Sequence, residues 1–128
     1  KLSLVHYCQG FSEQYNMLRF VYKVAGTTFR QEAVEKIAKQ LSAGKQPYVK
    51  LEKEPTNQYD PNAIKVIADN EFIGYVPKSE AEKVHAILDD SENAVIINTL
   101  RRTGSAYQNI GFLVTTYYGP DYDEDEIV

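Results

Sequence analysis

Two short apolar runs, residues 63–68 and 72–76, are joined by the pair Asp69-Asn70 and closed by Pro77. Runs of this length that are rich in β-branched residues suit strands better than helices. Asp and Asn tolerate the backbone of a tight turn, although the glycine that usually completes such a pair is absent. The segment therefore predicts an antiparallel hairpin, and the fold of the chain has to place this hairpin in a sheet.

Four further segments have the composition of strands. Residues 18–24 are rich in aromatic and β-branched residues, and residues 48–53 alternate between apolar and charged side chains. Residues 94–100 and 110–118 complete the set, and a basic connection that contains glycine, residues 101–104, separates them. Together with the hairpin, these segments predict a mostly antiparallel β structure.

Two segments have the periodicity of helices. Residues 31–42 repeat apolar side chains at three- and four-residue spacing, and Gly44 is placed to end the helix. Ser79 and Glu82 fit a capping box, so a second helix is expected to run from there to about Leu88. The predicted fold class is mostly β (α+β), a small curled sheet or partial barrel with two helices.

The length of 128 residues suits one hydrophobic core. No internal repeat or low-complexity linker divides the chain. We expect an N-terminal extension at residues 1–17, one domain at residues 18–118 and an acidic, disordered tail at residues 119–128.

Acidic residues are concentrated at the C-terminal end. Five of the 18 acids lie in the last eight residues, so residues 1–120 carry 14 basic and 13 acidic side chains, about +1. The tail is predicted to be solvated, and the alternative is a flexible phosphate mimic that competes with a ligand. The charge of the remaining chain permits nucleic-acid binding but predicts weak non-specific affinity.

Several classes of protein do not fit the sequence. No apolar run has the roughly 20 residues of a membrane helix, and the first residues lack the features of a signal peptide, so a cytoplasmic location without membrane contact is expected. Cys8, His6 and His85 are too few for a zinc site, and no metal or cofactor is predicted. His85 lies on the apolar stripe of the second helix, which predicts a packing role.

Enzymatic activity is not expected. The chain has no nucleotide-binding glycine loop, no H-E-x-x-H and no G-x-S-x-G. The acid pairs Asp89-Asp90 and Glu52-Glu54 fall in contexts that suit a solvated surface.

Three ordered segments resemble the signature of the HIRAN family. Residues 54–64 read E-P-T-N-Q-Y-D-P-N-A-I, residues 73–77 read I-G-Y-V-P, and residues 24–30 read V-A-G-T-T-F-R. The resemblance covers roughly residues 18–102 and implies an OB-like partial barrel. Family members occur alone in bacteria and phages or fused to helicase-like enzymes, and the best understood eukaryotic member captures the 3′-OH end of single-stranded DNA at stalled replication forks.

The resemblance implies a nucleic-acid-binding site, with single-stranded DNA ends as the ligand. Phe29 and Tyr59 match aromatic residues that stack on bases, which favours binding without a required base sequence. Asp60 matches the carboxylate that accepts the terminal hydroxyl. An ionised carboxylate accepts a hydrogen bond from a free 3′-OH and repels the phosphate of a continuing strand.

Some of these residues have structural alternatives. Tyr59 and Asp60 could serve only to build a turn with Asn57 and Asn62, whose side chains can bond nearby backbone. Phe29 could equally belong to the core. Tyr75 could face the same groove as Tyr59 or only cover the sheet; these alternatives stay open in the sequence.

Phosphate contacts are expected from Arg30 and Lys78, which lie near the starts of the two predicted helices. In the eukaryotic member an arginine precedes the stacking aromatic residue, whereas Thr28 occupies that position here. The departure leaves open a shifted contact, weaker binding or a different ligand.

The competing function is a protein-interaction module that recruits a helicase or another DNA-processing protein. The tyrosine-rich ends of the chain, residues 7–22 and 117–122, would contribute to such an interface.

Overall fold

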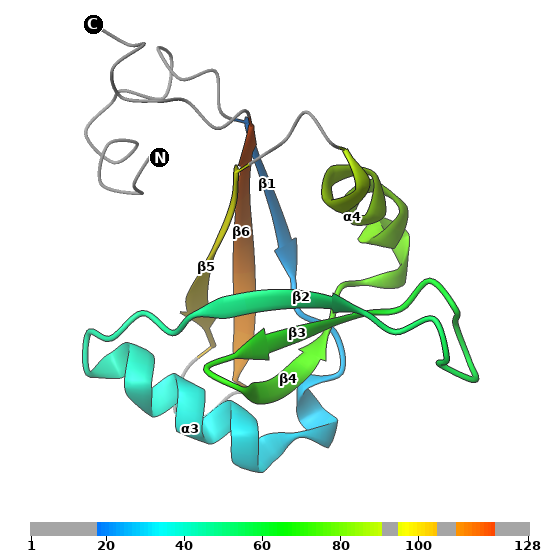
Figure 1. The fold of residues 1–128 in the computed structure, drawn as a ribbon. Helices are drawn as coiled ribbons and strands as arrows, with labels where there is room; N and C mark the ends of the chain where they lie inside the picture. The colour runs from blue at the N-terminus through cyan, green and yellow to red at the C-terminus, as the bar shows by residue number, and fades with distance from the viewer. Residues whose placement is uncertain (1–17, 91–94, 105–109, 120–128) are drawn as a thin grey trace, which may run out of the picture.

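The computed structural model describes residues 18–90, 95–104 and 110–119. Figure 1 shows the arrangement of the elements, six strands and two α-helices in this part of the chain. In chain order they are β1 (Leu18–Lys23), the single 3₁₀ turn η2 (Thr27–Phe29), α3 (Gln31–Ser42), β2 (Val49–Lys53), β3 (Ile64–Ala68), β4 (Glu71–Tyr75), α4 (Lys78–Asp89), β5 (Val95–Thr103) and β6 (Gly111–Gly119). The predicted fold class, mostly β with two helices, is confirmed. The predicted extension, residues 1–17, and all but the first residue of the predicted tail lie outside the described residues.

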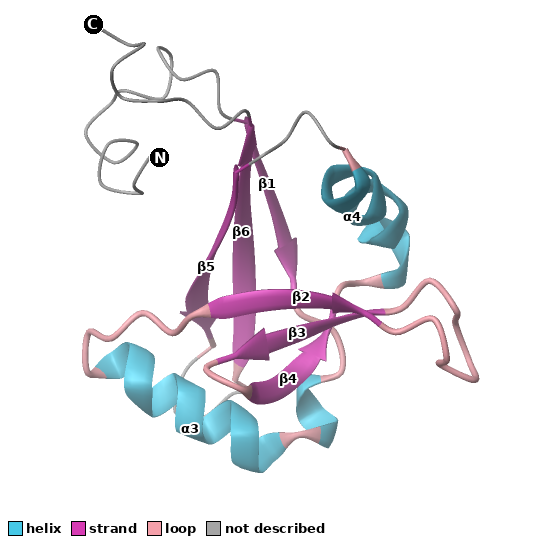
Figure 2. Cartoon of the chain, in the orientation of Figure 1, coloured by secondary structure: helices cyan, strands magenta, loops and turns pink. Residues whose placement is uncertain are grey.

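The strands form two three-stranded antiparallel sheets that face each other across the core. The orders are β1-β6-β5 and β2-β3-β4. Figure 2 shows the second sheet crossing in front of the first, with α3 below them and α4 beside β1. Consecutive strands pair within each sheet because their connections are short, except that β1 pairs with β6 from the far end of the chain.

The hairpin of β3 and β4 forms as predicted. Asp69 and Asn70 have positive φ angles of 46° and 68°, as a two-residue turn of the type that matches strand twist requires. The turn has no glycine, but hydrogen bonds stabilise it. The carboxylate of Asp69 accepts from the backbone N–H of Tyr48 at 2.7 Å and from the side chain of Gln40.

Two contacts curl the sheets into a partial barrel. At one side, Ala25 and Tyr75 exchange backbone hydrogen bonds of 2.8 and 2.9 Å. This approach requires Gly74, since a Cβ there would lie 2.4 Å from the carbonyl oxygen of Ala25. At the other side, the side-chain amide of Gln46 bonds both the N–H and the C=O of Leu100 in β5, at 2.6 and 3.0 Å.

The core lies between the sheets and includes buried side chains from both helices. A series of hydrogen bonds between side chains lies within it. The Tyr22 hydroxyl bonds Thr116 Oγ1 at 3.0 Å, and Thr116 donates to Asn98 Oδ1 at 2.7 Å. The core residues include Val24, Val34, Ile37, Ala38, Val49, Ile64, Val66, Ile73, Val84, Leu100, Phe112 and Val114.

Two local predictions are wrong. The capping box does not form, because α4 begins at Lys78 directly after Pro77, and no side chain caps it. Pro77 is the N-cap residue, and its carbonyl oxygen accepts from the N–H of Glu80 at 2.8 Å, so the helix begins one residue before Ser79. The basic connection after residue 100 is instead part of β5, since Arg101 pairs with Leu113 and the ladder continues to Thr103.

Within the described segments, no helix combines the length and apolar character that a membrane crossing demands.

Candidate nucleic-acid interface

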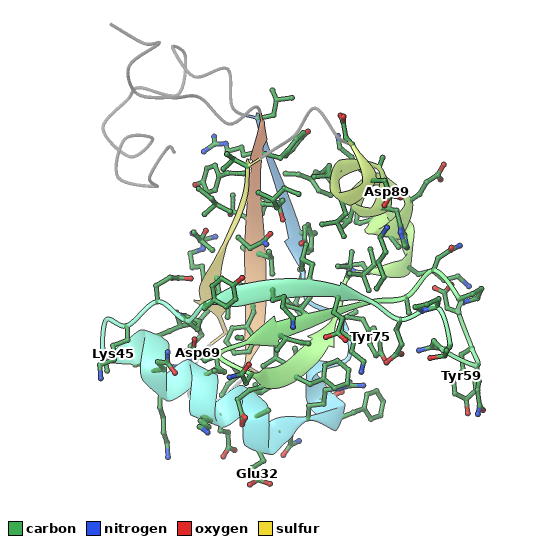
Figure 3. All side chains as sticks on the ribbon, in the orientation of Figure 1. Glu32, Lys45, Tyr59, Asp69, Tyr75 and Asp89 are labelled. Atoms are coloured by element: carbon green, nitrogen blue, oxygen red, sulfur yellow. The ribbon has the colours of Figure 1, made fainter. Side chains whose placement is uncertain are left out.

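An open groove of about 640 Å³ lies between the 54–60 loop, the end of β4 and the start of α4. It contains most of the residues that the sequence identifies as candidates. These lining residues are Arg30, Asn57, Tyr59, Asp60, Tyr75 and Lys78. Figure 3 shows Tyr59 projecting from the outer end of the loop and Tyr75 on the strand side.

The loop is shaped by Asn57. Its Oδ1 accepts hydrogen bonds from the backbone N–H groups of Tyr59 and Asp60, both at 2.9 Å. The Asp60 Oδ1 in turn accepts from the N–H of Asn62 at 2.9 Å. These bonds fix the backbone so that Tyr59 points outward, with 93% of its surface exposed. A ring this exposed contributes nothing to the core and is available to a ligand.

A second hollow, of about 420 Å³, adjoins the groove on the other side of Asp60 and Lys78. Its wall includes His85, whose Nε2–H donates to the backbone carbonyl of Asn62 at 2.9 Å. His85 is only partly buried, and its hydrogen bond ties α4 to the loop that carries Asp60. Asn62 therefore contributes to the loop through its backbone.

Tyr75 is held by Glu54. The hydroxyl of Tyr75 donates to Glu54 Oε1 at 2.9 Å, Asn57 Nδ2 donates to the same oxygen at 2.6 Å, and Lys65 Nζ lies 2.8 Å from Oε2. These bonds, that of Lys65 foremost, lower the pKa of Glu54 to about 2. Burial, and then the bond to Glu54, raises the pKa of Tyr75. Glu54 thus links the loop to β4.

The prediction of a solvated Glu54 is wrong, because only 20% of its side chain is exposed. Its role was missed because an acid in a polar loop has no distinctive pattern. The one available signal is its position three residues before Asn57, within the segment that resembles the family signature.

Arg30 is fixed at the groove wall. Its Nη1 donates to the carbonyl oxygen of Gly26 at 2.7 Å, and its Cζ lies 4.1 Å from the ring centre of Phe72 and 5.1 Å from that of Tyr75. The two rings meet edge to face at 5.2 Å. Phe72 was missed as a contributor to the site, because in the sequence it is one more apolar residue of the hairpin.

Two other candidates lie apart from the groove lining. Thr28 and Phe29 form the end of η2 and are exposed, Phe29 by 86%. The alternative that Phe29 belongs to the core is therefore wrong. Lys78 is the first residue of α4 and is exposed at the groove.

The chemistry of the groove is that of a site for a polar, anionic and partly aromatic ligand. The cations Arg30 and Lys78 can contact phosphates, Tyr59 offers a ring face, and Asp60 offers a hydrogen-bond acceptor. Over the residues that the structure describes, no three His, Cys, Asp or Glu side chains gather as metal ligands would.

Comparison with known proteins agrees with the resemblance in the sequence. A search of curated proteins finds no matching relative. Among solved structures, the crystal structure of the HIRAN domain of human HLTF matches with a TM-score of 0.54 and 22% identity, over 85% of this chain and 79% of that chain. This likeness shows a shared fold. The HIRAN domain model matches residues 17–117, most of the chain, and the chain therefore belongs to the HIRAN domain family.

Proposed function

We propose that this HIRAN domain binds nucleic acid, and in particular single-stranded DNA at a free 3′-OH end, in the groove beside the 54–60 loop. The observation that carries the proposal is the pairing of Tyr59, 93% exposed, with the adjacent carboxylate of Asp60 in one open groove. The resemblance to the family member that holds DNA ends supports the same ligand. A role in replication or repair beside a helicase-like partner follows from that resemblance.

Each lining residue has a role in the proposed complex. Tyr59 stacks on a terminal base, which contributes roughly 1–3 kcal/mol regardless of base identity. Asp60 accepts the hydrogen bond of the 3′-OH through the carboxylate oxygen that does not bond Asn62. Arg30 and Lys78 contact the phosphates that precede the end, and Tyr75 forms the floor of the groove.

The proposal is tested by fluorescence titration with two oligonucleotides that differ only in a 3′-OH or a 3′-phosphate. A hydrogen bond to a charged group is worth about 1.5–3 kcal/mol, so we expect a preference for the 3′-OH of about tenfold or more. Equal affinity for the two oligonucleotides, or no binding of either, would contradict the proposal.

Asp60→Asn is the sharpest variant, because the asparagine oxygen can still accept from the N–H of Asn62 while the charge is lost. The preference for the 3′-OH should fall towards one, and the matched control Glu35→Gln, an exposed position on α3, should keep it. Tyr59→Ala should lower the affinity for both oligonucleotides by the same factor. Its control is Tyr48→Ala, since Tyr48 is 74% exposed but does not line the groove.

A further inference from the structure

The sheet of β1, β6 and β5 has an outer face as well as the face that packs on the core. Side chains alternate along a strand, and the buried residues Tyr22, Val114 and Leu100 are register neighbours on the inner face. Their chain neighbours Lys23, Leu113 and Arg101 must therefore lie on the outer face. Both helices contribute buried side chains to the core between the sheets, whereas Arg19, Val21, Lys23 and Arg101 on the outer face are exposed, so no described element covers this part of the face.

The charge of this sheet differs from that of the whole chain. Its three strands contain four cations and no aspartate or glutamate, although acids outnumber basic residues by 18 to 14 in the sequence. Three of the four cations, Arg19, Lys23 and Arg101, lie on the outer face and are exposed. None of the three belongs to an ion pair within the described part of the chain. Over the described residues, the outer face is therefore positive, and no acidic side chain is paired with these three cations.

The three cations are spaced for one extended anion. Lys23 and Arg101 both align with Leu113, one on each side of β6, which places their backbones about 10 Å apart. Arg19 lies four residues along β1 from Lys23, about 13 Å away. These separations reach or exceed the screening length of about 8–10 Å at moderate salt, so an anion must extend along the face to contact all three cations.

Gly111 contributes to the geometry of this face. A Cβ at this position would lie 3.2 Å from Cε of Lys23 and 2.6 Å from Oγ1 of Thr103. The absence of a side chain therefore lets Lys23 lie across β6 towards β5. The hydroxyls of Thr99 and Thr115, which occupy the same face, are further donors for phosphate oxygens.

We propose that this outer face, defined by Arg19, Lys23 and Arg101, binds the phosphodiester backbone of single-stranded DNA at a distance from its end. The inference rests on the proposed function for the choice of nucleic acid as the polyanion. It assigns a second surface to the domain, since none of these three residues lines the groove that contains Tyr59 and Asp60. The groove selects the end, and the outer face adds affinity that is independent of the end and sensitive to salt.

The test uses a circular single-stranded DNA, which has no end for the groove to hold, and the full chain. Binding is measured by fluorescence at salt concentrations from about 50 to 200 mM. Each phosphate contact on a single strand contributes about −0.7 to the slope of log affinity against log salt. The triple variant Arg19→Gln, Lys23→Gln and Arg101→Gln should reduce the magnitude of this slope by about 2 and lower the affinity at the lowest salt at least tenfold.

The control removes the same number of exposed cations elsewhere, with Lys39→Gln, Lys45→Gln and Lys50→Gln. It has the same net charge as the triple variant and should keep the wild-type slope to within about 0.5. If the triple variant is not folded by circular dichroism, the double variant of Arg19 and Lys23 replaces it, with an expected slope change of about 1.4.

The outcomes separate the two proposals. An unchanged slope for the triple variant, an equal loss in the control, or no binding of the circle would overturn the outer-face proposal. None of these three results affects the preference of linear DNA for a 3′-OH, which tests the groove. Conversely, a circle that binds wild type but not the triple variant supports the outer face even if linear oligonucleotides show no end preference.

Discussion

The hydroxyl of Tyr75 in β4 donates a hydrogen bond to Oε1 of Glu54, 2.9 Å away at the start of the 54–60 loop. The same carboxylate accepts from Asn57 and is paired with Lys65 in the neighbouring strand. One acidic side chain therefore sets both the floor of the groove and the position of the loop that presents Tyr59.

The Glu54→Gln variant should be less stable than wild type at neutral pH, and the difference should disappear in acid. The folded state lowers the Glu54 pKa from 4.5 to about 2, so the unfolded chain takes up the proton first. The stabilisation is therefore complete above pH 4.5 and is lost as pH falls towards about 2. Urea unfolding of both proteins across this range measures it. A stability difference that is constant with pH would exclude this role for the charge of Glu54.

Asn57→Ala should reduce DNA affinity several-fold while Asn62→Ala has little effect. The side chain of Asn57 accepts from the backbone N–H groups of Tyr59 and Asp60, and each such bond is worth about 0.5–1.5 kcal/mol. Asn62 joins the loop through its backbone, which the substitution keeps. Titration of both variants with a 3′-OH oligonucleotide compares them, and an equal effect of the two substitutions would argue against the loop geometry.

Arg30→Lys should weaken DNA binding even though it conserves the charge. The guanidinium lies over the rings of Phe72 and Tyr75 and bonds the carbonyl of Gly26, a geometry that the flexible ammonium of lysine does not reproduce. We expect an affinity loss of about fivefold to tenfold, equivalent to about 1 kcal/mol from the cation–π contact. The reverse exchange at an exposed site, Lys45→Arg, is the control and should leave affinity unchanged. Full affinity in Arg30→Lys would show that only the charge matters.

Local patterns in the sequence were sufficient to predict the hairpin, α3 and most strand positions. Residues close in the sequence determine both the turn at Asp69-Asn70 and the helix over residues 31–42, so local patterns are enough to predict them. The start of α4 was misplaced because Pro77, not Ser79, is the N-cap: its carbonyl oxygen accepts from the N–H of Glu80 at 2.8 Å, which places Ser79 inside the helix.

The parts of the site that could not be predicted depend on contacts between distant residues. Arg30 reaches Phe72 and Tyr75 only because Ala25 pairs with Tyr75 across the two sheets. The spacing of apolar residues in the sequence does not indicate this contact between the two sheets. Likewise, a loop glutamate such as Glu54 has no pattern that distinguishes a solvated acid from one that holds a tyrosine.

Gly74→Ala should destabilise the fold where the two sheets join. The new Cβ would lie 2.4 Å from the carbonyl oxygen of Ala25 and 2.5 Å from Cγ1 of Val24, so the backbones must separate. Overpacking of this kind costs about 1–3 kcal/mol. Hydrogen exchange should show lost protection at the N–H groups of Ala25 and Tyr75, which bond each other's carbonyls. Wild-type protection at both amides would mean that the join tolerates a side chain.

Tyr22→Phe should destabilise the protein by about 1–2 kcal/mol at neutral pH, because it leaves the buried Oγ1 of Thr116 without the hydroxyl that it meets at 3.0 Å. The substitution should also change the alkaline limit of stability. Burial raises the pKa of Tyr22 from 10.0 to about 12, so the folded state keeps the proton that the unfolded chain releases. Wild type therefore loses stability as pH rises from 10.0 towards about 12, and the variant lacks this component. Thermal unfolding of both proteins across this range measures the difference, which should shrink as pH increases. If the two proteins lose stability in parallel, the phenol of Tyr22 does not set the alkaline limit, and another buried group must do so.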